Sequence, residues 1–304
     1  MALRYVTVDV FSDFRFGGNQ LSVVLDAGGL DEELMQAIAS EFSYAETTFV
    51  RPPADAANTA EVRIFTPKSE VPFAGHPNVG TAFALARIGE VFGKPVGETV
   101  RFEEKAGLVP VEIHRDGGDP VGARLTSPQP FELGDPVRAD VIAACCGIEP
   151  SDIATHVHEP CKASCGLPWV FACAASPEVV ARARPNSAAF AEHLPASASV
   201  GIELYAPVGG TAPNGADCTA RVFAPEFGVT EDAATGSANV TLAGLLAALD
   251  PAADATLVTT ISQGVEMGRP SLLIAEADKA DGAVTATRIG GRCVPVMDGS
   301  LTLD

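Results

Sequence analysis

The chain has 304 residues, and 47% of them are apolar, which is enough to fill the cores of two ordinary domains. Thirty-nine acidic residues against twenty basic ones give a formal charge of -19. A surface this acidic repels nucleic acid and anionic membranes. We therefore expect no nucleic-acid or membrane partner, and the composition favours a small molecule as the ligand.

The N-terminal stretch MALRYVTVDVF alternates polar and apolar residues, which predicts a strand and not the apolar block of a signal peptide. No run approaches the roughly 20 apolar residues of a membrane span. Seven cysteines, an odd number, fit reduced thiols better than a disulfide framework. These features predict a cytoplasmic location.

Short β-branched segments, each bounded by Gly, Pro or polar residues, predict strands along the first half of the chain. These segments cover residues 4–10, 20–25, 46–50, 61–66, 99–104, 108–114 and 123–126. Between them, Asp31 opens the segment DEELMQAIASEF, in which Leu34, Ile38 and Phe42 fall on one face at helical spacing. This segment is predicted to be an amphipathic helix.

Turn-forming residues in HRDGGDP and in the Pro-rich TSPQPFELGDP mark the predicted domain boundary. We expect one domain over residues 1–118 and a second over residues 119–304, with the final strand able to pack against the first domain. The second half predicts a helix in RADVIAACCG, a strand in PWVFACA, helical stretches to His193, strands at 200–205 and 217–223, and mostly strand over the last fifty residues.

An internal sequence repeat relates the two halves. The strand VRIFTP, residues 62–67, is repeated as ARVFAP, residues 220–225, and the helix-like GHPNVGTAFALA is repeated as GSANVTLAGLLA after a loop three residues longer. The pattern predicts two similar halves, and the alternative is chance similarity between two alanine-rich helices. Helices that are apolar on all sides belong inside something, such as a curved sheet.

The start of each repeated helix is a candidate anion site. A helix N-terminus has unpaired N–H groups and partial positive charge, so it attracts carboxylates and phosphates. Pro77 suits the first turn of one helix, while Asp232 and Ser237 flank Gly236 at the other. With approximate twofold symmetry between the halves, the two N-termini would face one interdomain cleft and hold an anionic substrate from both sides.

Glu46, in SYAETTFV, is the candidate acid/base, because its apolar and hydroxyl neighbours should partly desolvate it. The alternative is an outward-facing strand glutamate. His76 is either a substrate-orienting group or a residue that caps the helix. Asp232 and Ser237 could likewise be plain N-cap residues, the commoner role of these types.

Four segments resemble successive motifs of the PhzF-like family, which comprises phenazine-biosynthesis isomerases and their relatives on the diaminopimelate epimerase fold. The segments are FRFGGNQLSVVLDAGGL, SYAETTFV, EVPFAGHPNVGTA and EDAATGSANVTLAGLL. They occur in family order and span most of the chain.

The resemblance implies an α+β fold of two similar, pseudo-twofold related domains, each a β-sheet rolled into a barrel around a central α-helix, with the active site in the cleft between them. It also implies a homodimer. In the phenazine enzyme a glutamate moves a proton between carbons of a dihydro-hydroxyanthranilate without metal or organic cofactor.

The family's functional residues carry over to individual positions of this chain. The catalytic glutamate matches Glu46, and the polar pocket residues match His76, Asp232 and Ser237. The backbone N–H groups of the pocket match Gly75 and Gly236. The full expected set is catalytic Glu46, His76 and Asp232, with substrate-binding Gly75, Pro77, Asn78, Gly236 and Ser237.

Two positions depart from the family pattern, because Gln20 and Ala233 stand where many relatives have proline. These loop changes leave the expected chemistry intact but weaken any claim to the same substrate. Racemising members of the fold place a cysteine at each helix N-terminus. This chain has Ala74-Gly75-His76 and Thr235-Gly236-Ser237 there, which disfavours two-cysteine chemistry.

A cofactor-independent isomerase is therefore the leading hypothesis. The alternatives are an epimerase or racemase that pairs Glu46 with another acid, and a non-catalytic module that binds a small molecule. The stretch THVHEPCKASCG holds His156, His158, Cys161 and Cys165, but its spacing matches no standard zinc finger. We expect no metal.

Overall fold

The computed structural model describes residues 2–209 and 214–303. The chain forms two compact units, of which unit 1 comprises Met1–Thr126 and Gly290–Asp304 and unit 2 comprises Ser127–Ile289. The sequence placed the division after residue 118, in a Gly-rich turn. That turn joins β9 (Gly107–Asp116) to β10 (Asp119–Thr126), which pair with each other, so β10 belongs to unit 1.

Unit 1 contains all seven strands predicted in the first half of the chain, together with short β-strands in the loops. Its other elements are β1 (Ala2–Val10), β2 (Asn19–Val24), a 3-10 turn (Ala27–Gly29), α1 (Glu32–Phe42), β3 (Glu46–Arg51), β4 (Ala60–Phe65), β5 (Glu70–Val71), α2 (Gly75–Ile88), β6 (Glu90–Val91), β7 (Lys94–Pro95) and β8 (Thr99–Glu104). The long β19 (Ala283–Thr302) pairs with β1 and β10.

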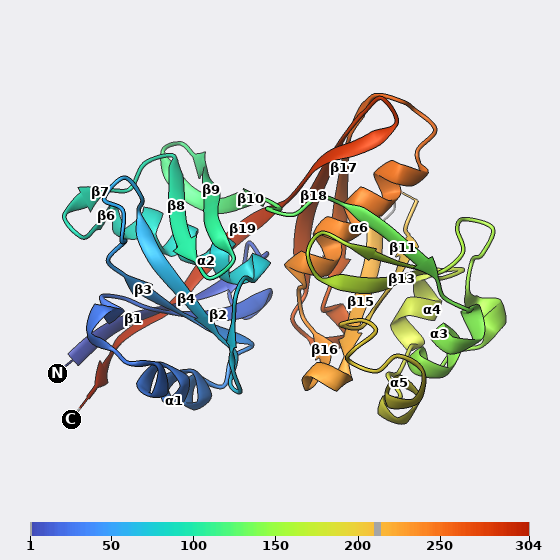
Figure 1. Ribbon diagram of the computed structural model, residues 1–304, viewed down its shortest axis with the longest axis horizontal. Coiled ribbons are helices and arrows are strands. Elements are labelled where there is room, and N and C mark those ends of the chain that lie inside the picture. Colours follow the sequence, from blue (N-terminus) through green and yellow to red (C-terminus); the bar gives the residue numbers. More distant parts are fainter. Residues whose placement is uncertain (1, 210–213, 304) are drawn as a thin grey trace. The chain divides into compact units, whose positions relative to one another are not determined.

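Eight strands of unit 1 close into a barrel around α2 (Figure 1). The pairing runs β1, β2, β3, β4, β8, β9, β10, β19 and back to β1, with β2–β3 and β4–β8 parallel. Every residue of α2 from Gly75 to Ala86 is buried. The prediction that an all-round apolar helix lies inside a curved sheet is therefore confirmed.

Close packing against the barrel wall requires a glycine in α2. A Cβ on Gly80 would come within 2.6 Å of side-chain atoms of both Leu21 and Val10. The predicted amphipathic helix is also present as α1, outside the barrel. Asp31 caps it by accepting a hydrogen bond from the Leu34 N–H at 2.9 Å, and Met35, Ile38 and Ala39 are its buried residues.

Unit 2 has the same plan, with three further helices besides its central one. Its elements are β11 (Glu132–Pro136), α3 (Ala139–Cys146), a 3-10 turn (Pro150–Asp152), β12 (Cys161–Ser164), β13 (Pro168–Cys173), α4 (Pro177–Arg182), α5 (Ser187–His193), β14 (Ile202–Pro207), β15 (Cys218–Ala224), a 3-10 turn (Pro225–Phe227), β16 (Val229–Asp232), α6 (Gly236–Leu249), β17 (Ala255–Gln263), a 3-10 turn (Val265–Met267) and β18 (Ser271–Ala280).

The central helix of unit 2 is α6, which packs against β17, β18, β12 and β13 (Figure 1). It also requires a glycine, because a Cβ on Gly244 would lie 2.4 Å from the Phe131 ring. The helices α3, α4 and α5 cover an apolar cluster that includes Ile142, Val180, Phe190 and Leu204. No helix among residues 2–209 and 214–303 is long and apolar enough to cross a membrane.

Strand register shows that the internal sequence repeat corresponds to a repeat in the structure. In unit 1, Ile64 of β4 pairs with Val71 of β5, and in unit 2 their counterparts Val222 and Asp232 pair in the same way. The parallel pair Ala60–Phe102 of β4 and β8 is likewise matched by Cys218–Ile261 of β15 and β17. Each unit therefore builds the same strand–helix–strand frame.

An arginine holds each frame together in the same way. The Arg63 Nε donates to Glu70 at 2.8 Å, and the Arg221 Nε donates to Glu231 at 2.8 Å. Both arginines donate to the second oxygen of the same carboxylate through an Nη2. Each guanidinium also lies over the phenylalanine two residues on, at 5.2 Å for Arg63 and 5.0 Å for Arg221. Bidentate pairs of this kind fix geometry as well as charge.

Candidate active site

Glu46 is the first residue of β3, where it pairs with Leu21 of β2. Its side chain is 19% exposed, so the carboxylate is largely withdrawn from water while still within reach of the surface. The buried residues that follow it on β3 are held by hydroxyl pairs: Ser22 with Thr47 at 2.6 Å and Thr48 with Thr81 at 2.8 Å. The start of β3 is therefore fixed to both β2 and α2.

His76 lies in the first turn of α2, directly opposite this carboxylate. The distance from His76 Nε2 to Glu46 Oε2 is 3.3 Å, and the histidine side chain is 5% exposed. Burial lowers the pKa of His76 to about 3, and a hydrogen bond with the Gln20 backbone acts in the opposite direction. The imidazole is neutral at physiological pH as a consequence.

The bond to Gln20 also assigns the tautomer of His76. A backbone contact that raises the pKa of an imidazole is an acceptor, so the ring donates an N–H to the Gln20 carbonyl. Because Nε2 faces Glu46, Nδ1 carries that hydrogen and Nε2 keeps its lone pair. A lone pair aimed at a carboxyl can accept a hydrogen bond from its protonated form.

The N-terminus of α2 has no side-chain cap, because its N-cap residue is Ala74. Gly75, Pro77 and Asn78 are all buried in the first turn. The Asn78 Nδ2 donates to the Ala74 carbonyl at 3.1 Å. His76 is thus not the cap of this helix, and Asn78 has a bond within the helix itself. A substrate-binding role for Gly75, Pro77 and Asn78 stays a prediction.

The N-terminus of α6 is organised by a buried amide. Its N-cap residue, Thr235, donates its hydroxyl to the Asp232 carboxylate at 2.7 Å. Gln263, at the end of β17, accepts from the Thr235 N–H at 3.1 Å and donates to the Asp232 carbonyl at 2.8 Å. Asp232 is therefore held in place from two sides and does not cap the helix.

Gly236 and Ser237 occupy the first turn of α6. Gly236 is buried, Ser237 is half-buried, and the Ser237 carbonyl accepts the Thr241 hydroxyl at 2.9 Å. The structure thus brings together Glu46 with His76 in unit 1, and Asp232 with the residues around Gly236 in unit 2. Sequence reasoning missed Gln263, whose only local signal is a polar residue followed by Gly264 at the end of a β-branched strand.

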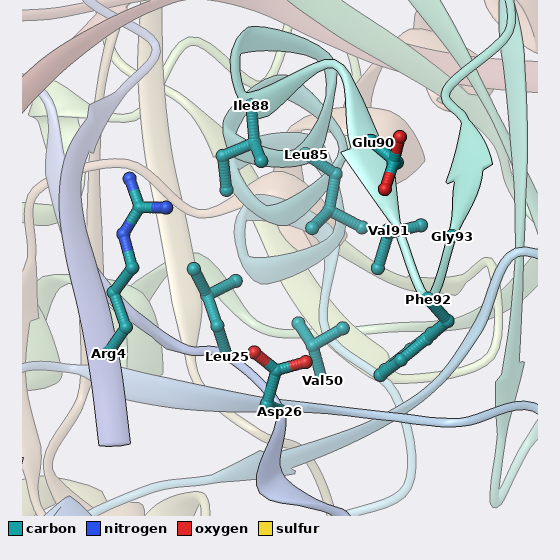
Figure 2. A pocket seen from close by; sticks show the side chains of 10 residues that line it. All are labelled: Arg4, Leu25, Asp26, Val50, Leu85, Ile88, Glu90, Val91, Phe92 and Gly93. Carbon is teal, nitrogen blue, oxygen red and sulfur yellow. The ribbon is translucent and has the colours of Figure 1, made fainter. Parts of the chain in front are cut away.

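A cavity of about 330 Å³ lies at the C-terminal end of α2 (Figure 2). Leu85 and Ile88 of α2 line it together with the polar residues Arg4, Asp26 and Glu90. It contains none of the predicted site residues. We place the candidate site at the N-terminal end of the helix, because the opposed carboxylate and imidazole lie there.

The cysteine- and histidine-rich stretch of unit 2 is used for packing. His158 Nε2 hydrogen-bonds to the Tyr205 hydroxyl at 3.0 Å, and Cys161 and Cys165 are buried free thiols. Over the described parts of the chain, no three His, Cys, Asp or Glu side chains are grouped so that they could hold a metal ion.

Comparison with known sequences places the chain in a family. The sequence model of the phenazine biosynthesis-like protein family matches residues 8–299. An uncharacterized isomerase of Mesorhizobium japonicum is 37% identical, over 98% of each chain. The trans-2,3-dihydro-3-hydroxyanthranilate isomerase of Pseudomonas chlororaphis is 33% identical, over 99% of each chain.

Comparison with solved structures gives the same result for the fold. A PhzF-family phenazine biosynthesis protein of Bacillus anthracis superposes with a TM-score of 0.84 over 100% of both chains, at 24% identity. A protein of Pseudomonas aeruginosa described as a predicted epimerase has a TM-score of 0.76 and 27% identity, over 99% of this chain and 100% of the other.

Fold, sequence match and relatives together define an isomerase of the two-barrel type. The chain belongs to the phenazine biosynthesis-like protein family. The sequence-based resemblance to PhzF-like proteins is confirmed.

Proposed function

We propose that this isomerase moves a proton between carbons of a small carboxylate-bearing metabolite, with Glu46 as the acid/base. The observation that carries the proposal is the Glu46 carboxylate set 3.3 Å from a buried, neutral imidazole at the N-terminus of α2. The 33% identical relative named for trans-2,3-dihydro-3-hydroxyanthranilate supplies the substrate class.

In the proposed reaction, ionised Glu46 takes a proton from one carbon of the substrate. The resulting carboxyl O–H donates to His76 Nε2, whose lone pair is free to accept because Nδ1–H is bound to the Gln20 carbonyl. The proton then returns to a second carbon on the same face of the substrate. One carboxyl is sufficient for both steps. A neutral His76 stabilises the protonated form of Glu46 by accepting its hydrogen bond, without taking the proton itself.

The substrate carboxylate needs a positive partner, and we assign that role to helix N-termini. The first turn of α2, with Gly75, has no side-chain cap, so its N–H groups suit an anion. In unit 2 the corresponding groups are the Gly236 N–H and the Ser237 hydroxyl, with Asp232 orienting a polar substituent of the substrate. The substrate thus contributes the charge and the chain contributes fixed dipoles.

Two further parts of the proposal follow from the family. The reaction uses no metal or organic cofactor, because a carboxylate and an adjacent acceptor supply both proton transfers. The chain acts as a homodimer, which light scattering would report as twice the chain mass of 31.3 kDa.

The test is turnover of trans-2,3-dihydro-3-hydroxyanthranilate by wild type and by Glu46→Gln. We expect kcat/KM to fall about 10²–10⁴-fold, the usual contribution of a positioned acid/base. Glu61→Gln is the matched control, since Glu61 is a strand carboxylate paired with Arg51 at 3.0 Å on the neighbouring β4.

Each alternative function gives a distinct result in that assay. Inverted chirality at the exchanging carbon identifies an epimerase. Thermal stabilisation by the compound without turnover identifies a binding module. Activity of Glu46→Gln within a few-fold of wild type contradicts the assigned acid/base.

A further inference from the structure

A second carboxyl group points into the unit 1 barrel at the same end as Glu46. Along β8, Val100 and Phe102 are fully buried, and the alternation of the strand turns Glu104 to the same inward side. The Glu104 carboxyl lies near the side-chain amide of Asn78 in the first turn of α2, and His76 of the same turn faces Glu46. Glu104 and Glu46 thus lie at the same end of α2.

Strand register identifies the counterpart of Glu104 in unit 2. Ala60 and Glu61 of β4 pair with Phe102 and Glu103, just as Cys218 and Thr219 of β15 pair with Ile261 and Ser262. The next residue in each strand is Glu104 in unit 1 and Gln263 in unit 2. The same comparison of the two helices matches Asn78 with Asn239 and Ala74 with Thr235.

Gln263 shows what this position does when it is fully bonded. Its Oε1 accepts from the Asn239 Nδ2 at 2.7 Å and from the Thr235 N–H at 3.1 Å. Its Nε2 donates to the Asp232 carbonyl at 2.8 Å and to the Thr235 hydroxyl at 3.0 Å. One neutral amide, 1% exposed, therefore ties the first turn of α6 to the loop that precedes it.

The positions that correspond to Thr235 and Gln263 differ in unit 1. Ala74 replaces the threonine and removes its hydroxyl, and a carboxyl replaces the amide. Neither Glu104 oxygen makes a hydrogen bond of ordinary geometry with the described residues, whereas both polar atoms of the Gln263 amide are bonded. Burial raises the pKa of Glu104 to about 8, while the nearby Asn78 amide acts to lower it. The carboxyl is therefore neutral at pH 7.

We propose that Glu104 is a positioning residue for the Glu46–His76 pair, holding the first turn of α2 through Asn78 as Gln263 holds that of α6 through Asn239. Asn78 passes the constraint on, because its Nδ2 donates to the carbonyl of Ala74, the residue two before His76. The inference rests on the proposed function of Glu46, since it assigns Glu104 to the same site.

The protonation state of Glu104 decides whether it can make the same kinds of hydrogen bond as a glutamine. A protonated carboxyl has one acceptor oxygen and one O–H donor, matching the acceptor and donor that Gln263 uses. An ionised carboxyl has acceptors only, so it loses the donor and places a charge beside buried atoms. Ionisation of Glu104 should therefore loosen the first turn of α2 and move His76 away from Glu46.

The other charged groups on elements next to Glu104 already have partners. Glu70 of β5 is bonded to Arg63 of β4 and to Lys105, which follows Glu104 in the chain. On β3 and α2, Glu46 and His76 face each other. The buried residues of β9, which include Val109 and Val111, are apolar. Titration near pH 8 at this end of the barrel is therefore assigned to Glu104.

The first test reads His76 directly and needs no substrate. With ¹⁵N-histidine labelling, the His76 ring signals are followed from pH 6 to pH 10, well above the pKa of about 3 of this imidazole. We expect them to shift with a midpoint near pH 8 in wild type and to stay constant in Glu104→Gln. Asn78→Ala should also abolish the shift, because it removes the connecting amide. Identical titrations in wild type and Glu104→Gln would overturn the proposal.

The second test is the pH dependence of turnover of trans-2,3-dihydro-3-hydroxyanthranilate. Wild-type kcat should fall about tenfold per pH unit above the pKa of Glu104, and Glu104→Gln should lack this alkaline limb. Gln263→Glu, the reciprocal variant, should show a second decrease of kcat at alkaline pH. An alkaline limb that survives in Glu104→Gln contradicts the positioning role. Failure of the proposed function is separate, because Glu46→Gln would then remain active at every pH.

Discussion

The two units share a frame and differ in the chemistry that it presents. Each has an arginine bound to a carboxylate behind the strand, a buried central helix with an asparagine bonded back to its N-cap carbonyl, and a following parallel strand. In unit 1 the frame brings a carboxylate to an imidazole. In unit 2 the position equivalent to Glu46 is Gly201, and the one equivalent to His76 is Ser237.

Register explains why the second unit has no carboxylate there. Thr47 pairs with Phe65 in unit 1, and Ile202 pairs with Phe223 in unit 2, so the residues just before them, Glu46 and Gly201, correspond. A Cβ on Gly201 would lie 2.1 Å from the Phe223 carbonyl oxygen. The close approach of strands excludes any side chain at that point. The duplicated frame thus places a carboxylate beside an imidazole in one unit, and a helix N-terminus bonded through Gln263 in the other.

The largest difference in stability between the two frames should come from their arginines. Besides binding Glu231, Arg221 donates through Nη1 to the carbonyls of Val180, Ala181 and Ala183. Arg221→Ala should therefore cost about 3–5 kcal/mol, as expected for a broken buried pair. Arg63→Ala should cost less, because Glu70 keeps Lys105. Urea unfolding of the two variants measures this order, and equal losses would mean that the carbonyl bonds add nothing.

Substitutions at the two helix N-termini should have smaller effects, and these effects should fall on different kinetic constants. His76→Phe keeps the ring but removes the acceptor opposite Glu46, and we expect kcat to fall about tenfold to a hundredfold, because the protonated carboxyl is then left without a partner. Ser237→Ala, at the equivalent position of α6, should mainly raise KM. Steady-state kinetics gives both constants. A larger fall in kcat for Ser237→Ala than for His76→Phe would reverse the assignment of roles.

The pH dependence of stability should show one buried acid in each unit. Burial raises the pKa of both Glu104 and Glu203 from 4.5 to about 8. Between these values each carboxyl is protonated in the folded chain and ionised in the unfolded chain, so stability falls by about 1.4 kcal/mol per pH unit for each and levels off above pH 8.

His76 has the opposite sign. Its pKa is lowered from 6.5 to about 3, so below pH 6.5 the unfolded chain binds a proton that the folded chain does not, and stability is lost as pH falls. The cleanest window for the acids is therefore pH 6.5–8. In this window, Glu104→Gln and Glu203→Gln should each make the unfolding free energy fall less steeply with pH. If either variant leaves the slope unchanged, that residue does not titrate as we expect.

Much of the frame could be predicted from the sequence, because it depends on local patterns. β-branched runs predicted the main strands, Asp31 predicted the start of α1, and two helices apolar on all sides predicted central helices. The short β5, β12 and β16 were not predicted. Two of them are four residues long and one is two, and pairing with a neighbouring strand defines them more than propensity does.

The site was predictable only in part. Glu46 and His76 were named separately, but their 3.3 Å contact depends on packing between residues far apart in the chain. Glu104 was missed because FEEKAG resembles an exposed acidic turn. The alternation of Val100, Phe102 and Glu104 was visible in the sequence, but only the fold brings Glu104 next to Asn78 of α2. Gln263 was missed for the same reason.

The central claim is that proton transfer belongs to Glu46 of unit 1, while Asp232 of unit 2 orients the substrate. It is tested most directly by deuterium incorporation from D₂O into turned-over trans-2,3-dihydro-3-hydroxyanthranilate, followed by NMR in Glu46→Gln and Asp232→Asn at saturating substrate. The account predicts that Glu46→Gln loses incorporation about 10²–10⁴-fold and that Asp232→Asn retains most of it. Incorporation by Glu46→Gln at the wild-type rate would contradict the claim.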